Sequence, residues 1–263
     1  MSKWVPEHIQ SAENATFKCL RRLTQDGTGY RSEGRIWVEG EHLCRAAELR
    51  GRAAELAVVT DTVWDAGVPD FMVSVRRMLV LPDALFKRLS PLESPAQYAY
   101  VMPLPPDPPL KEDVATIILD RVQDAGNVGS ILRSAAAFGF QQVIGLKGGA
   151  GLWSQKVLRA GMGAHFGLSL VDGASLEMVD RLKPPLLTTS SHAGRPLHEL
   201  QRERGLPAPC VWAFGHEGQG VGNSLAARAV MQVCIDQPGG EESLNVAAAA
   251  AICLYAGASA QLP

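Results

Sequence analysis

Apolar residues in the first ninety positions fall into short runs with helical or strand spacing. In the segment 13–24, Phe17, Leu20 and Leu23 recur on one side of a helix. Compact apolar runs such as Ile36-Trp-Val38 are typical of strands. Helices are expected at 13–24 and 41–47, and strands at 36–38, 56–59 and 78–81. The pattern predicts a small α/β domain over residues 1–92.

A proline-rich stretch follows this domain. Prolines gather between Pro91 and Pro109, with the run Met102-Pro-Leu-Pro-Pro-Asp-Pro-Pro109 at its end. Proline ends helices and cannot donate to a β-ladder. We therefore predict a semi-rigid linker over residues 93–112.

The remainder of the chain, residues 113–263, alternates continuous apolar runs with helical segments. Strands are expected at 114–119, 143–146, 168–171, 186–189, 211–214 and 230–235, and helices at 129–138, 154–159, 176–182 and 244–257. Strands that are apolar throughout are buried on both faces, which is typical of a parallel sheet covered by helices. The predicted fold class is α/β.

Composition removes several classes of protein. The 263 residues are 46% hydrophobic and 20% charged, with a formal net charge of -2, so a globular protein with a sizeable core is expected and a basic polyelectrolyte is excluded. The five cysteines form no CxxC pair, which argues against structural disulfides and structural zinc. No apolar run reaches the ~18–20 residues of a membrane span, and the segment MSKWVPEHIQ lacks a signal-peptide core. A cytoplasmic protein without a metal is expected.

Ligands of open α/β sheets bind beyond the carboxyl ends of the strands, and three loops there have unusual sequences. The first contains Asn127-Val-Gly129-Ser-Ile-Leu-Arg133 at a helix start. Asn127 is there either a helix cap or a site residue. Arg133 lies among apolar neighbours, and its planar guanidinium suits a phosphate.

The second loop, Phe214-Gly215-His-Glu217-Gly-Gln-Gly220-Val, is rich in glycine, which allows close approach to a ligand or a positive φ. Glu217 is either a turn-stabilising acceptor or a site residue. The third loop, Ser243-Leu-Asn245-Val, leads into an alanine-rich helix that either Ser243 or Asn245 could cap. The common nucleotide fingerprints G-x-G-x-x-G and GxxxxGK[ST] are missing, which argues against a nucleotide-dependent enzyme.

Together and in this order, the three loops resemble the motifs of the SpoU/TrmH-type RNA ribose 2'-O-methyltransferases of the SPOUT class. The segment Arg159-Ala-Gly-Met-Gly163-Ala-His-Phe is similar to a stretch in the ribosomal RNA enzymes of that family. Two positions depart from the family pattern: Ala125 stands where proline is usual, and Asp236 follows Ile235 where the family usually has proline.

The resemblance implies a parallel-sheet SPOUT domain with a C-terminal trefoil knot, preceded by a small α/β RNA-binding domain. It implies S-adenosyl-L-methionine as cofactor and a homodimer through the knotted domain. Positions that match the family's cofactor contacts are Gly215, Ile235, Leu244, Thr189 and Gly220. The expected substrate is ribosomal RNA, with transfer RNA second.

The same resemblance implies the catalytic set Arg133, Asn127, Glu217, Ser243 and Asn245. A ribose hydroxyl is a poor nucleophile, so its developing charge needs stabilisation. Arginine stays protonated, which favours an electrostatic and positioning role for Arg133 over that of a base. Asn127 would hold the ribose or Arg133, and the other three residues would support the loops and the substrate.

Basic residues of the first domain form a candidate RNA-binding surface: Lys18, Arg21, Arg22, Arg31 and Arg35. For any single residue, a solvated surface position is an equally good interpretation. The alternative function is that of a non-catalytic homologue that binds RNA in assembly or regulation. Binding of S-adenosylmethionine would distinguish the two functions.

Overall fold

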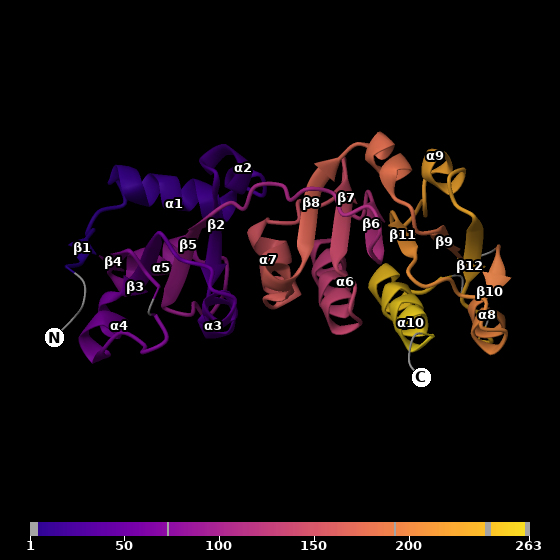
Figure 1. Cartoon of the computed structure of the whole chain (residues 1–263). Helices are drawn as coiled ribbons and strands as arrows, with labels where there is room; N and C mark the ends of the chain where they lie inside the picture. The colour runs from indigo at the N-terminus through magenta and orange to yellow at the C-terminus, as the bar shows by residue number, and fades with distance from the viewer. Residues whose placement is uncertain (1–4, 73, 192, 240–242, 261–263) are drawn as a thin grey trace. The chain divides into compact units, whose positions relative to one another are not determined.

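The computed structural model describes residues 5–72, 74–191, 193–239 and 243–260. The chain divides into two compact units, Met1–Pro106 with Trp153–Phe166, and Asp107–Leu152 with Gly167–Pro263. Each has its own sheet (Figure 1).

The first unit is built on a mixed sheet in the order β1-β4-β3-β5-β2, in which β5 is antiparallel to both of its neighbours. Its strands are β1 (Glu7–His8), β2 (Arg35–Glu39), β3 (Leu56–Thr60), β4 (Arg77–Leu81) and β5 (Tyr98–Pro103). Its helices are α1 (Ala15–Gln25), α2 (Gly29–Glu33), α3 (Glu41–Leu49), α4 (Asp61–Ala66), α5 (Asp83–Leu89) and α7 (Gln155–Gly161). The helices expected at 13–24 and 41–47 and the strands expected at 36–38, 56–59 and 78–81 are all present in this unit.

The boundaries of this unit differ from those expected. The segment 93–112, expected as a linker, contains β5, an interior strand of the sheet. The prolines flank the β-forming run Tyr98-Ala-Tyr-Val-Met102 instead of interrupting it, so the run keeps its ladder hydrogen bonds. The segment Trp153–Phe166 also belongs to this unit. There His42 Nε2 lies 3.1 Å from the carbonyl oxygen of Met162.

The second unit contains a seven-stranded sheet in the order β10-β12-β9-β11-β6-β7-β8, and every pairing is parallel. Its strands are β6 (Thr116–Asp120), β7 (Gln142–Leu146), β8 (Ser169–Ala174), β9 (Leu186–Ser190), β10 (Arg195–Pro196), β11 (Val211–Gly215) and β12 (Met231–Cys234). The six strands predicted from apolar runs are confirmed.

The connecting helices of this unit are α6 (Ala125–Ala137), α8 (Leu197–Arg202), α9 (Asn223–Ala226) and α10 (Val246–Ser259). The segment η2 (Leu176–Arg181) is a 3₁₀ helix, as is η1 (Ala164–Gly167), which follows α7 and passes from the first unit into the second at Gly167. The helix expected at 176–182 is thus the 3₁₀ helix η2.

Alternate residues of the central strands pack to opposite faces of this sheet. On one face Ile118, Ile144 and Val171 align in register and join the buried cluster that contains Leu225 of α9. On the other face α10 packs against α6 and β11 (Figure 1). A Cβ added at Gly257 of α10 would lie 3.3 Å from the indole nitrogen of Trp212, so the small residue permits this close packing. All strands present their carboxyl ends at one edge, where ligands of parallel sheets bind.

Candidate functional site

Glu217 links the second loop to the first. It lies in the turn after β11, and its carboxylate accepts hydrogen bonds from the backbone N–H groups of Gln123 (3.2 Å) and Asp124 (3.1 Å). It also accepts one from the side-chain amide of Asn127 (3.1 Å). Desolvation raises the pKa of Glu217, but these hydrogen bonds together outweigh it and leave the pKa below the ordinary value. Glu217 is therefore an ionised acceptor that holds two loops together.

Asn127 and Asn245 extend this connection to the third loop. Asn245 donates from Nδ2 to Oδ1 of Asn127 over 2.9 Å. Its own Oδ1 accepts from the backbone N–H groups of Ala247 and Ala248, which makes Asn245 the N-cap of α10. Each amide has its oxygen towards a donor and its nitrogen towards an acceptor, so both orientations are determined. We call Glu217, Asn127 and Asn245 the loop network.

Asn127 is not a helix cap. The cap of α6 is Asp124, whose carboxylate accepts from the backbone N–H of Asn127 over 2.7 Å. With its cap position filled three residues earlier, the Asn127 side chain is free to bond to Glu217 and Asn245. Of the two roles open to Asn127 in the sequence, the network favours a site residue. For the third loop, Asn245 and not Ser243 is the cap.

Gly215 allows the turn that carries Glu217 to fold back on β11. A Cβ at this position would lie 2.0 Å from the carbonyl carbon of Gly220 and 2.2 Å from the backbone nitrogen of Val221. Gly220 has φ +66°, a conformation that glycine adopts without strain. Both glycines therefore have a structural role in positioning Glu217.

Arg133 and Ser243 lie outside the loop network. Arg133 is on the exposed side of α6, and its guanidinium forms no ion pair within the described part of the chain. Ser243 is likewise exposed. The structure brings three of the five expected catalytic residues into hydrogen-bond contact and leaves the other two open to solvent.

Most residues expected to contact the cofactor lie at the carboxyl ends of adjacent strands. Thr189 and Gly215 belong to β9 and β11, and Ile235 directly follows β12. These three strands are neighbours in the sheet. The Thr189 hydroxyl donates to the carbonyl of Ala213 over 3.4 Å. Leu244 is 39% exposed. Asp236, which replaces the family's usual proline, pairs with His198 of α8 over 2.5 Å.

The expected RNA-binding cations of the first unit are on its surface, and most have acidic partners. Lys18, Arg21 and Arg22 line one hollow of α1. Lys18 pairs with Glu13, Arg22 with Glu33 and Arg35 with Glu55. Arg31 lies over the ring of Tyr30, 5.2 Å from its centroid. Exposed ion pairs of this kind contribute little to stability.

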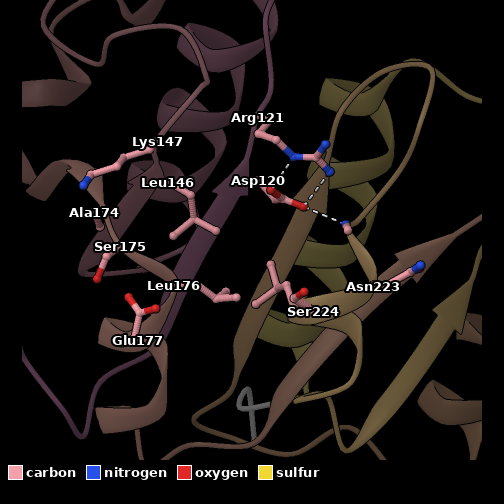
Figure 2. A pocket seen from close by; sticks show the side chains of 12 residues that line it. Asp120, Arg121, Leu146, Lys147, Ala174, Ser175, Leu176, Glu177, Asn223 and Ser224 are labelled. Carbon is pink, nitrogen blue, oxygen red and sulfur yellow. Dashed lines mark hydrogen bonds and ion pairs between the residues drawn. The ribbon is translucent and has the colours of Figure 1, made fainter.

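A polar pocket beside the loop network contains residues that the sequence did not single out. It has a volume of about 570 Å³ and lies beyond the carboxyl ends of β6, β7 and β8 (Figure 2). Asp120, the last residue of β6, and Arg121, which directly follows it, line the pocket. Arg121 has φ 59°, uncommon for a residue with a side chain, but only coordinates reveal such a conformation.

Other kinds of site find no support in the part of the chain described here. No cluster of His, Cys, Asp and Glu among these residues could hold a metal ion. All five cysteines are free thiols. None of the helices described is both long and apolar enough to cross a bilayer.

The chain is similar to proteins of one known family. Residues 115–255 match the model of the SpoU rRNA Methylase family. The chain is 29% identical to the 23S rRNA (guanosine(2553)-2'-O)-methyltransferase of Bacillus subtilis, covering 95% of this chain and 98% of that one. It is 31% identical to an uncharacterized tRNA/rRNA methyltransferase of Synechocystis, covering 94% and 92%.

Among solved structures, a TrmH-family protein from Porphyromonas gingivalis matches with a TM-score of 0.78 and 30% identity, over 94% of this chain and 98% of that one. The family match includes all three loops of the network, and the sheet that carries them is parallel throughout. The chain therefore belongs to the SpoU rRNA methylase family.

Proposed function

We propose that this protein transfers the methyl group of S-adenosyl-L-methionine to a ribose 2'-hydroxyl of ribosomal RNA. The loop network carries the proposal, because it joins the three motif-bearing loops through Glu217, Asn127 and Asn245 at the ligand-binding edge of the sheet. Family membership and the name of the Bacillus subtilis relative support ribosomal RNA as the substrate. They favour catalysis over a purely RNA-binding role.

The residues present fit the cofactor. Thr189, Gly215 and Ile235 stand on three adjacent strand ends, and the side chains of Thr189 and Ile235 are half-buried. We assign them, with Gly220 and Leu244, to the cofactor site beneath the trefoil knot that the family resemblance implies. When bound, the cofactor supplies an activated sulfonium methyl group. The carboxylate of Asp236, next to Ile235, already has a partner in His198.

Arg133 is assigned to the ribose and its phosphate. Its guanidinium is exposed and has no carboxylate partner among the described residues, so it is available to an anionic substrate. A protonated guanidinium stabilises the charge that develops on the 2'-oxygen but cannot remove the proton. Asn127 has one amide hydrogen and one lone pair left after its network bonds, enough to orient the ribose. Ser243 and Asn245 support the substrate from the third loop.

RNA is held in addition by the first unit in this proposal. Lys18, Arg21 and Arg22 share one hollow of α1, and Arg31 and Arg35 add charge. Because phosphate binding releases counterions, RNA affinity should fall steeply as salt rises. We assign the unit containing Met1–Pro106 to RNA binding, and we place the protein in the cytoplasm.

A homodimer through the second unit completes the proposal. On α10, Ile252 is 41% and Tyr255 58% exposed, and Tyr255 contacts Phe138 of α6 edge-on. Large apolar side chains exposed together often mark a protein interface.

The direct test is methyl transfer from radiolabelled S-adenosylmethionine to unmethylated ribosomal RNA. The wild-type protein should label the RNA, and Arg133→Ala should lose the activity while calorimetry shows unchanged cofactor binding. Comparable turnover by Arg133→Ala would remove this residue from the mechanism. A wild-type protein that binds the cofactor but labels no RNA would refute the function.

A further inference from the structure

The polar pocket beside the loop network has a layout suited to a nucleobase. Figure 2 shows Lys147, Ser175 and Glu177 along one side, and Asp120, Arg121, Asn223 and Ser224 along the other. Between the two sides lies an apolar floor made by Leu146 and Leu176. Its volume of about 570 Å³ is within the range of small-molecule sites, ~300–1,000 Å³. The flat face of a nucleobase could pack on the apolar floor, while the polar edge of the base bonds to the polar residues at the sides.

The two sides differ in how firmly they are fixed. Arg121 donates from Nε to Asp120 over 2.9 Å and from Nη1 to Gln219 over 3.1 Å, so its guanidinium is held in place. Lys147 is exposed and has no ion pair in the described ranges, which leaves its ammonium group available to a ligand. A hydrogen bond from Ser175 lowers the pKa of Glu177. The pocket thus offers a free cation and an ionised acceptor on the same side.

The pocket and the loop network share two loops. Gln123, whose N–H bonds to Glu217, donates from its side chain to the carbonyl of Gly148, next to Lys147. Asp120 accepts from the backbone N–H of Gly222 over 2.7 Å, and this ties the pocket to the loop that carries Glu217. Hydrogen bonds therefore join the loops that line the pocket to the loop that carries Glu217.

The pocket is separate from the proposed cofactor site. The ten residues assigned to catalysis or to the cofactor are all absent from its lining. The pocket is lined by the ends of β6, β7 and β8 and by residues 222–225. Of the assigned cofactor residues, Thr189 and Gly215 are on β9 and β11, and Ile235 directly follows β12. The pocket is therefore open to a ligand other than the cofactor.

We propose that this pocket binds one nucleotide of the RNA next to the methylated one, and that it helps select the target. The base lies on the floor of Leu146 and Leu176, and its N–H donors face the Glu177 carboxylate. Lys147 contacts the backbone phosphate of the same nucleotide. The inference rests on the proposed function, because it takes the RNA substrate from it.

The test compares RNA affinity among single variants, using fluorescence anisotropy with unmethylated ribosomal RNA and no cofactor. Removing a negative charge strengthens RNA binding if only general electrostatics matter. If Glu177 instead accepts from a base, Glu177→Ala should weaken binding about tenfold, within the range for one base-edge contact. Lys147→Ala should weaken binding and reduce the salt dependence by roughly one phosphate contact.

Lys111→Ala is the matched control. Lys111 is exposed in the same unit, but its backbone bonds to Gln142 at the amino end of β7, opposite the pocket. It should bind RNA within about twofold of the wild type, since an isolated surface charge contributes little. Melting temperatures near that of the wild type would show that each variant is folded, and calorimetry should give unchanged cofactor affinity.

Loss of RNA affinity in both Glu177→Ala and Lys147→Ala supports the inference. Wild-type or tighter RNA binding by Glu177→Ala overturns it, as does a loss of cofactor affinity in either variant. If the Glu177→Ala variant does not fold, the Lys147→Ala variant tests the inference alone. Wild-type RNA affinity and wild-type salt dependence in Lys147→Ala would then overturn the inference. If the wild type binds RNA but methylates none, the proposed function fails while the affinities still test the pocket.

Discussion

Gly215 provides the sharpest test of how the site is built. Replacing it with alanine places a Cβ 2.0 Å from the carbonyl carbon of Gly220 and 2.2 Å from the backbone nitrogen of Val221. Ordinary van der Waals contact begins near 3.4 Å, so this backbone must move by about 1.4 Å. The atoms belong to the main chain of a closed turn, so a change of side-chain rotamer cannot relieve the clash.

Overpacking of this kind costs ~1–3 kcal/mol, and backbone contacts place Gly215→Ala at the upper end. For a domain of this size, ~3 kcal/mol corresponds to a fall in Tm of about 6–12 °C. Displacement of the turn also moves Glu217 away from its three donors. Methyl transfer should therefore fall at least tenfold, even where the protein remains folded.

Gly218→Ala is the matched control in the same turn. Its added Cβ meets nothing closer than the His216 ring at 3.8 Å. Scanning calorimetry and the radiolabelled methyl-transfer assay should give near-wild-type values for Gly218→Ala and large losses for Gly215→Ala. A Gly215→Ala protein with wild-type Tm and turnover would refute the reasoning.

Three further predictions follow from the same contacts. The pKa of Glu217 is lower in the folded protein than in the unfolded chain. The ionised Glu217 carboxylate therefore stabilises the fold fully above the unfolded pKa of about 4.3. That stabilisation is lost as the pH falls through the lower pKa of the folded protein. Denaturation titrated from pH 6 to 3 should show a weaker pH dependence in Glu217→Gln, and an unchanged profile would contradict this. Asn245→Ala should lose about 1 kcal/mol of stability with the helix cap, whereas Asn245→Asp keeps the cap but not the donor to Asn127. Equal activity of Asn245→Asp and the wild type would show that this donor is dispensable. In sedimentation experiments Tyr255→Glu should yield monomers, and an unchanged dimer would place the interface elsewhere.

The strands of the second unit could be predicted because parallel strands buried on both faces read as continuous apolar runs. Strand β5 was missed because prolines surround it, although Tyr98-Ala-Tyr-Val-Met102 favours a strand on its own. Strand β10 and helix α9 are too short for periodicity to detect. The sequence thus predicts the helices and strands that have extended apolar runs, and it does not predict elements of only a few residues.

The site could be predicted in its residue types but not in its bonding. Motif order indicated that Asn127, Glu217 and Asn245 act together, and the structure joins these three. Asp124 caps α6 and so leaves the side chain of Asn127 free for this network. Several polar residues precede the helix, and the sequence does not show which of them is the cap. The pairing of Arg22 with Glu33 and of Arg35 with Glu55 depends on tertiary contacts that spacing does not encode.

The central claim is that the protein methylates the ribose of ribosomal RNA, and site-resolved mapping of 2'-O-methyl groups in cellular RNA tests it most directly. Cells without the protein should lack the modification at a specific ribosomal RNA position. Expression of the wild type should restore it, whereas Arg133→Ala should not. Identical ribose methylation in ribosomal RNA with and without the protein would contradict the account.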